Sequence, residues 1–299
     1  MNNECGRRID SYPSFTIRQK KKGNVMVLFE QSSIVKELAA LTYDMWSKGW
    51  DEYNGGNVSC ILRDEDLEQL PRAEPIKQVT VADIPFSMVG KYILFTASGS
   101  HFRNLSDHIK RDLVVIKVTE KGYNIVWGFS ENRRPTSEFY MHLLAHAQRL
   151  AIDPNHRVVV HNHAPNATAY SLISDHNDKS YTLPLWRVLT ESIVVFPDGV
   201  GILPWELPGT LAIAQHTVEK LRECRLVVWA FHGILATGRD FQDCFGLIET
   251  VDKAAMIHMK TRTSRQYEGL SDDDLYAVCQ VLKVQPREGF LDLSKGSQK

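Results

Sequence analysis

The sequence predicts an α/β fold in which one domain is built around a central sheet. Segments with the apolar spacing of helices alternate with short apolar runs typical of strands. No stretch rich in proline, glycine and serine divides the 299 residues, and no internal repeat is evident. Hydrophobic residues make up 43% of the chain and charged residues 24%, an ordinary globular composition that excludes disorder.

The first half of the chain begins with a helix and continues with strands. Apolar residues recur at helical spacing from Ile34 to Met45, behind a serine pair that can cap a helix, and predict a helix over about residues 33–48. A loop of asparagine and glycine follows at residues 54–57. Short β-rich runs then predict strands over residues 58–62, 92–96, 113–118 and 123–128.

Helices and strands alternate in the second half of the chain. We expect helices over residues 137–151, 166–173, 210–224, 240–260 and 272–282. We expect strands over residues 157–161, 193–196 and 226–230. The predicted domain covers residues 31–285, between a basic N-terminal arm (residues 1–30) and a polar C-terminal tail (residues 286–299).

Charge and cysteine content narrow the function classes. Lysine and arginine total 35 and aspartate and glutamate 36, so the net charge of −1 gives no overall attraction to nucleic acid or to an anionic membrane. The five cysteines are scattered and never form a CxxC pair, which indicates a reducing compartment. The apolar stretch at residues 25–29 is too short for a signal sequence or a membrane span. We therefore expect a cytoplasmic protein that binds neither nucleic acid nor membrane.

Histidines follow two of the predicted strands. His161 and His163 are two residues apart at the end of one strand, so their side chains project to the same side. His232 follows the strand predicted at residues 226–230. Three histidines and one open position are a recurrent arrangement for catalytic zinc. The alternative is that these imidazoles only satisfy hydrogen bonds in the core, but their coincidence at two strand ends favours a metal site.

Two further histidines share a predicted helix face with a glutamate. His142 and His146 follow Glu138 at the fourth and eighth positions. One of these imidazoles could reach the metal, but packing between helix and sheet is the expected role.

Three loops carry the small and hydroxyl residues that bind phosphate, at residues 54–57, 96–100 and 135–138. Glycines let backbone N–H groups approach an anion, and Thr136 and Ser137 stand at a predicted helix start, which attracts negative charge. Each loop alone is ordinary turn chemistry. Together with a metal site, the three loops predict a small phosphorylated substrate. Neither a Walker A motif nor GxGxxG is present, so a nucleotide cofactor has no support.

The chain resembles the class II, zinc-dependent sugar-phosphate aldolases, a family that also includes ribulose-phosphate epimerases and adducin-like modules. The resemblance runs in the family's order from about residue 33 to residue 285. Its segments are GWDEYNGGN (49–57), TASG (96–99), PTSE (135–138), HNHA (161–164), VFPDGVGILPW (195–205) and FHG (231–233). The chain departs from the family in its longer N-terminal arm and in Ala97, which replaces the first glycine of the family's TGSG loop.

The resemblance implies a mostly antiparallel central sheet flanked by helices on both faces, and a homotetramer with sites near subunit interfaces. The implied reaction is reversible retro-aldol cleavage of a phosphorylated ketose, in which one Zn²⁺ per subunit stabilises the enediolate. His161, His163 and His232 would hold the zinc. Glu138 would act as acid/base and as a fourth ligand when no substrate is bound, and Glu191 would assist from a neighbouring subunit. The implied phosphate and substrate positions are Asn54, Gly56, Asn57, Ser98, Gly99, Thr136 and Ser137.

Other functions within the same family stay open at this point. The chain could be another metal-dependent sugar-phosphate aldolase, or an epimerase that breaks and remakes the aldol bond while keeping both halves bound. It could also be a non-catalytic adducin-like module, although the intact histidine set with Glu138 counts against this. Imidazole sites also take cobalt, iron or nickel, so zinc itself rests on the resemblance.

Overall fold

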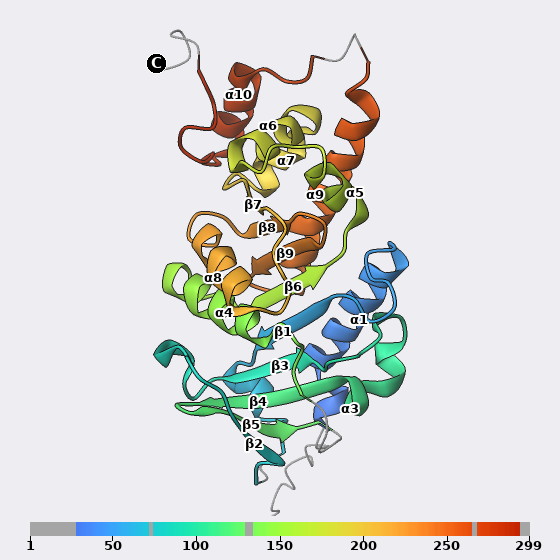
Figure 1. The fold of residues 1–299 in the computed structure, drawn as a ribbon, viewed down its shortest axis with the longest axis vertical. Helices are drawn as coiled ribbons and strands as arrows, with labels where there is room; N and C mark the ends of the chain where they lie inside the picture. Colours follow the sequence, from blue (N-terminus) through green and yellow to red (C-terminus); the bar gives the residue numbers. More distant parts are fainter. Residues whose placement is uncertain (1–27, 72–73, 129–133, 265–267, 294–299) are drawn as a thin grey trace, which may run out of the picture.

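The computed structural model describes residues 28–71, 74–128, 134–264 and 268–293. Within these residues a single nine-stranded sheet runs through the molecule in the order β2-β5-β4-β3-β1-β6-β9-β8-β7, which is the order from bottom to top in Figure 1. Neighbouring strands pair antiparallel except β7 and β8, which pair parallel. The predicted α/β fold with a mostly antiparallel central sheet is confirmed.

The strands are short and mostly buried. Their bounds are β1 Asn57–Ile61, β2 Lys77–Thr80, β3 Tyr92–Thr96, β4 Leu113–Thr119, β5 Gly122–Trp127, β6 Val158–Asn162, β7 Val200–Leu203, β8 Leu226–Trp229 and β9 Gly233–Gly238. Strands β1 and β6 pair at the middle of the sheet, so the N-terminal and C-terminal halves of the chain share one continuous sheet.

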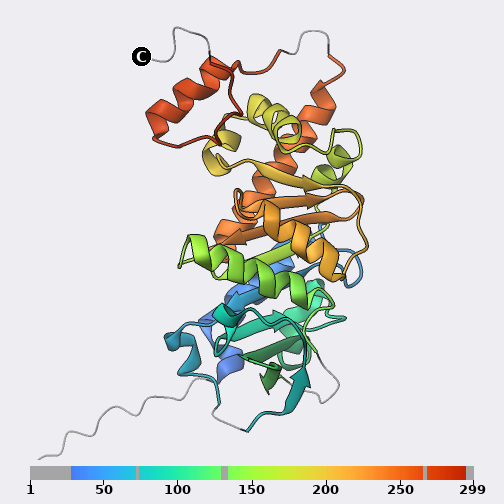
Figure 2. The ribbon, with the colours of Figure 1, turned by 60° about the vertical axis from the view of Figure 1, so that its left-hand side comes forward.

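Helices cover both faces of the sheet. Their bounds are α1 Ser33–Ser47, α2 Asp64–Leu67, α3 Ile109–Asp112, α4 Phe139–Ile152, α5 Pro165–Ser171, α6 Asp178–Val188, α7 Thr190–Val195, α8 Leu211–Lys220, α9 Phe241–Thr261 and α10 Asp272–Leu282. Short 3₁₀ turns occupy Phe29–Gln31, Phe86–Met88 and Phe102–His108. Helices α4 and α8 lie on one face, in front of the sheet in Figure 2, while α1, α5 and α9 lie on the other.

The alternation of side chains in the central strands decides which residues meet which helices. In β1, Val58 and Cys60 join the core cluster that contains α1 and α9. Ser59, between them, faces the opposite side and contacts α4. In β6, Val159 packs with residues of α4 and α8. This period of two is what a half-buried strand requires, and it aims Ser59 at the helix that begins next to Glu138.

Most predicted elements agree with the structure to within a few residues, and one is wrong. Residues 193–196, expected as a strand, belong mostly to α7, where the amide of Phe196 donates to the carbonyl of Ser192. A short apolar run fits either type of element by its pattern alone. The strand of this region is β7, which begins four residues further on and pairs with β8.

The two chain ends differ in how far the structure describes them. Residues 1–27 of the predicted arm lie outside the described residues. Within the predicted tail, Phe290 is buried and its ring packs against Trp186, with 5.6 Å between the ring centroids. Arg287 lies 3.3 Å from a carboxylate oxygen of Asp178. In the described residues, no helix combines the length and the apolar character that a membrane span needs.

Candidate metal centre

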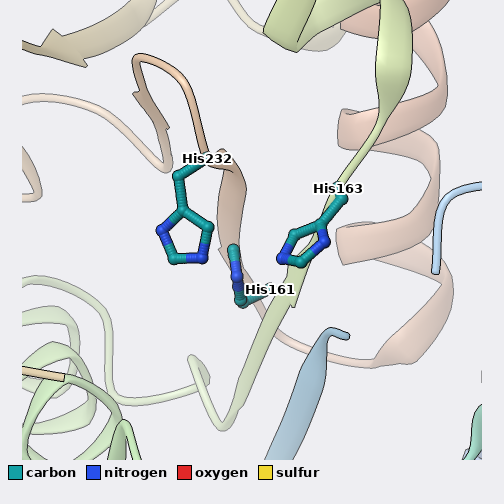
Figure 3. Close-up of side chains that lie close together, drawn as sticks. All are labelled: His161, His163 and His232. Atoms are coloured by element: carbon teal, nitrogen blue, oxygen red, sulfur yellow. The ribbon is translucent and has the colours of Figure 1, made fainter. Parts of the chain in front are cut away.

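Three imidazoles converge where β6 ends and β9 begins. His161 belongs to β6, and His163 follows that strand directly. His232 lies in the turn that joins β8 to β9, and the pairing of β6 with β9 brings that turn beside His163. Each imidazole offers one nitrogen, and these three atoms all lie within 4.8 Å of one another (Figure 3). The structure thus brings together the three histidines singled out in the sequence.

Hydrogen bonds orient two of the three rings. Nδ1 of His161 donates to the carbonyl oxygen of Ile234 at 3.1 Å, and Nδ1 of His163 donates to Oε1 of Glu52 at 2.7 Å. A neutral imidazole carries one hydrogen, so each of these rings keeps a lone pair on Nε2. Histidine ligands of metals are commonly held by such a second contact. Glu52 was not predicted, although it stands inside the GWDEYNGGN motif.

Burial favours the neutral form of His161 and His232. Burial, with a smaller contribution from the neighbouring imidazoles, lowers the pKa of His161 and the pKa of His232 to about 3. Metal binding requires an unprotonated nitrogen. A low pKa therefore leaves the imidazole nitrogen free to bind a metal ion at neutral pH. Three imidazole nitrogens that converge on one point fit a divalent cation such as zinc.

Glu138 faces the same point from the start of α4. It is 7% exposed, and its carboxylate lies 3.9 Å from Nε2 of His161 and 4.0 Å from Nε2 of His232. Nδ2 of Asn57 donates to Oε2 of Glu138 at 2.8 Å. Burial raises the pKa of Glu138, while the hydrogen bond from Asn57 and the nearby imidazoles oppose that rise. A carboxyl whose pKa is raised toward neutrality suits proton transfer.

The three loops predicted to bind phosphate surround one cavity of about 210 Å³ beside the histidines. Gly56 has a φ of +77°, and an added Cβ there would lie 2.1 Å from Oδ1 of Asp51, so the chain needs glycine at this close approach. The cavity is also lined by Gly55, Ala97 and Ser100, which belong to the predicted loops without having been named individually, and by Pro208, which was not predicted. Lining residues that were predicted are Asn54, Gly56, Asn57, Ser98, Gly99, Thr136, Ser137, Glu138, His161, His163 and His232.

Four of the residues considered in the sequence have surroundings that refine their roles. The Asn57 amide is engaged by Glu138 on one side and by His142 on the other. His142 and His146 do not line the cavity, and both contact Ser59. Glu191 lies in the first turn of α7, is exposed, and is not among the residues that line the cavity of this subunit.

Comparison with known proteins places these residues in a family context. Residues 36–259 match the family described as Class II Aldolase and Adducin N-terminal domain. The chain is 40% identical over 268 residues to rhamnulose-1-phosphate aldolase of Enterococcus faecalis, covering 88% of this chain and 95% of that protein. It is 37% identical over 262 residues to the protein of the same name from Listeria monocytogenes, covering 86% of this chain and 96% of that protein.

Solved structures share the fold. The sugar-phosphate aldolase from Thermotoga maritima superposes with a TM-score of 0.63 at 27% identity, covering 78% of this chain and 96% of that chain. An L-fuculose 1-phosphate aldolase superposes with a TM-score of 0.58 at 21% identity, covering 85% of this chain and 97% of that chain.

Proposed function

Because the chain belongs to the class II aldolase and adducin family and is an aldehyde-lyase, we propose that its substrate is L-rhamnulose 1-phosphate. It cleaves this ketose reversibly into dihydroxyacetone phosphate and L-lactaldehyde. Relatives with this activity in their name match nearly the full length of the domain. The observation that carries the proposal is the convergence of three imidazoles and Glu138 on the cavity that the three predicted loops line.

We assign one zinc ion per subunit to His161, His163 and His232. Its support is a set of three converging imidazole nitrogens that leaves a coordination position open for substrate. When bound, a divalent cation supplies Lewis-acid stabilisation of the negative charge that develops on substrate oxygens during cleavage.

Glu138 holds and moves the proton at C3. Breaking the C3–C4 bond leaves its electron pair on C3 as the enediolate of dihydroxyacetone phosphate, and the C4 hydroxyl gives its proton to the Glu138 carboxylate as it becomes the aldehyde carbonyl. Protonated Glu138 then gives its proton to C3, and in the condensation direction its carboxylate removes it. A general base of this kind contributes roughly 10²–10⁴-fold to the rate. Glu191 of a neighbouring subunit assists the proton transfer in this proposal.

The loops hold the phosphate away from the breaking bond. Among the residues that line the cavity, Gly56 and Gly99 through their backbone and Ser98, Thr136 and Ser137 through their hydroxyls bind the phosphate in this proposal. Phosphate bound there orients the reacting carbons, because binding energy from a remote group is used for positioning. The side-chain amide of Asn57 donates a hydrogen bond to Glu138 and so acts by holding that carboxylate.

A homotetramer in the cytoplasm completes the proposal. Tyr53, Leu207 and Phe231 are exposed large apolar residues, and each directly precedes a residue that lines the cavity. Exposed apolar surface at a site's rim is typical of a protein interface, which supports a site near a subunit boundary. The described cysteines are free and buried, as suits a reducing compartment.

Removal of metal tests the proposed function. We expect enzyme freed of metal by a chelator to lose cleavage of L-rhamnulose 1-phosphate and to regain it with Zn²⁺. Full activity in a sample verified as metal-free would contradict the proposal. Trapping of free L-lactaldehyde separates an aldolase from an epimerase, which releases neither half, and an adducin-like module would bind no stoichiometric metal.

A further inference from the structure

A chain of polar side chains runs from Glu138 into the core behind the cavity. Nδ2 of Asn57 donates to Glu138 at 2.8 Å, and Oδ1 of Asn57 contacts Nε2 of His142. Nδ1 of His142 lies 2.6 Å from Oγ of Ser59. The same hydroxyl lies 2.7 Å from Nε2 of His146. Two elements provide these five residues. Asn57 and Ser59 lie on one face of β1. Glu138 stands at the start of α4, and His142 and His146 lie on one face of that helix.

All residues of this hydrogen-bonded series are buried. Ser59 and His142 are 0% exposed, His146 is 2% exposed and Asn57 is 7% exposed. Buried polar groups lower stability unless they are hydrogen-bonded. Apolar side chains between β1 and α4 would pack equally well and would need no hydrogen-bond partners. The buried polar residues found there therefore indicate a role beyond packing.

The contacts impose a direction on the hydrogen bonds. Because the Asn57 amide presents its nitrogen to Glu138, its oxygen faces His142, whose Nε2 must carry the hydrogen. A neutral imidazole has one donor and one acceptor, so Nδ1 of His142 accepts from the Ser59 hydroxyl. That hydroxyl has then used its only hydrogen and accepts from Nε2 of His146. Burial lowers the pKa of His142 and lowers that of His146 to about 3, which keeps both rings neutral.

We propose that His142, Ser59 and His146 are positioning residues that hold the Asn57 amide with its N–H groups toward the Glu138 carboxylate. The inference rests on the acid/base role proposed for Glu138. With the amide reversed, its oxygen would face the carboxylate, and the two acceptors would repel each other. Glu138 would then leave its place between His161 and His232.

The kinetic test removes the shared hydroxyl. Ser59→Ala leaves both imidazoles in place but breaks the link between them. We expect kcat to fall about 10-fold, since loss of outer-shell partners typically reduces activity by about 10–100-fold, while KM and zinc content stay as in the wild type. Ser59→Thr, which keeps the hydroxyl, restores kcat. Ser171→Ala is the matched control, because Ser171 is also fully buried but donates only within its own helix.

Several kinetic outcomes would overturn the inference. One is a Ser59→Ala enzyme with wild-type kcat. Another is a fall in zinc content or a rise in KM parallel to the loss of kcat, which would indicate general disruption of the site. An equal loss in Ser171→Ala would indicate sensitivity to any buried cavity.

A spectroscopic test uses the unsubstituted, zinc-loaded protein. Nitrogen-15 NMR of the imidazoles reports which ring nitrogen carries the hydrogen. We expect both His142 and His146 as neutral Nε2–H tautomers, and a change at His142 in Ser59→Ala. An Nδ1–H tautomer of His142 in the wild type would overturn the inference, because Asn57 would then turn its oxygen to Glu138. Since this readout needs no substrate, an enzyme without lyase activity would refute the proposed function and leave the tautomer result to decide the inference by itself.

Discussion

Glu138 combines features that a proton-transfer residue needs. It is nearly buried, it accepts a hydrogen bond from Asn57, and it lies about equally far from His161 and His232. Burial disfavours the charged carboxylate while the donor and the imidazoles favour it. The carboxyl can therefore release and regain a proton without leaving its place.

Substitution of Glu138 should separate proton transfer from metal binding. We expect Glu138→Ala to lower kcat by about 10²–10⁴-fold, the usual contribution of a general base, while the protein still binds zinc. Glu138→Gln keeps the shape and should lose turnover equally. Steady-state kinetics and zinc analysis of the same samples check this. Near wild-type turnover in Glu138→Gln would show that the proton moves by another route.

The contact between Glu52 and His163 should support metal affinity. Glu52→Gln removes the charge that holds Nδ1 of His163, and we expect zinc to bind roughly 10-fold more weakly, at the lower end of outer-shell effects because this carboxylate is 71% exposed. Glu65→Gln is the matched control, with a side chain that is 73% exposed and remote from the histidines. Competition with a zinc-binding dye measures both, and equal affinities would refute the role of Glu52.

At the scale of elements, the pairing of β6 with β9 builds the metal centre. The turn that carries His232 reaches His161 and His163 only because β9 lies beside β6 in the sheet. Gly233 begins β9 at the tightest point, where an added Cβ would lie 2.3 Å from the carbonyl oxygen of Asn162 and 3.0 Å from each of the two imidazoles of the β6 segment.

Gly233→Ala should therefore disturb the metal centre. We expect lower zinc affinity and lower stability, because the methyl group must displace backbone or the ligands themselves. Gly246→Ala, in α9 with nothing within 4 Å of the added Cβ, should keep zinc affinity and raise the free energy of unfolding by about 0.4–1 kcal/mol. Zinc titration and urea unfolding test the pair. Unchanged zinc affinity in Gly233→Ala would contradict the described packing.

The buried histidines of α4 should make stability depend on pH. His146 has a pKa of about 3 in the folded protein against an ordinary value of 6.5. Between these values the unfolded chain binds the proton and the folded one does not, so the free energy of unfolding falls as pH falls. From pH 7.5 to pH 5, this one residue accounts for about 2 kcal/mol.

Urea unfolding of metal-free protein at the two pH values measures this effect. His146→Gln should lose less stability on acidification than the wild type. His108→Gln, which removes an exposed histidine, is the control. The same acid sensitivity in His146→Gln and wild type would contradict a neutral, buried His146.

The sequence was informative where a pattern had one physical meaning. Amphipathic spacing located α1, and apolar runs located β6 and β8, because burial of one face demands that periodicity. β9 was missed because its residues, GILATG, are small and begin at a glycine. α6 was missed because it contains Pro184, which normally breaks a helix.

Site residues that depend on long-range contacts were not predictable in the same way. His161, His163 and His232 stood out by type and place in the chain. Glu52 and Ser59 act through contacts across 111 and 83 residues of sequence, to His163 and His142. Such partners are defined by strand pairing and helix packing, which a single sequence does not reveal.

At the scale of the whole molecule, the site lies where the two halves of the sheet meet. Loops of the N-terminal half and of the segment that leads into α4 line the cavity, and the C-terminal half provides the imidazoles. Glu191, in α7, is exposed and outside this cavity. In the proposed tetramer it acts on the site of a neighbouring subunit.

Subunit mixing tests this placement of Glu191. We expect Glu191→Ala and Glu138→Ala each to be poorly active as pure oligomers. Mixed oligomers formed by co-expression should recover activity above either parent, because some sites then receive both intact glutamates from different copies. Mixtures no more active than the parents would place both residues in one subunit's site, and a monomer in sedimentation would exclude the shared site.

The most direct test of the central claim is anomalous X-ray scattering at the zinc edge from crystals of the zinc-loaded protein. We predict one strong peak per subunit, about 2.0–2.1 Å from an Nε2 atom of each of His161, His163 and His232. A peak elsewhere, or no ion shared by these three imidazoles, would contradict the account.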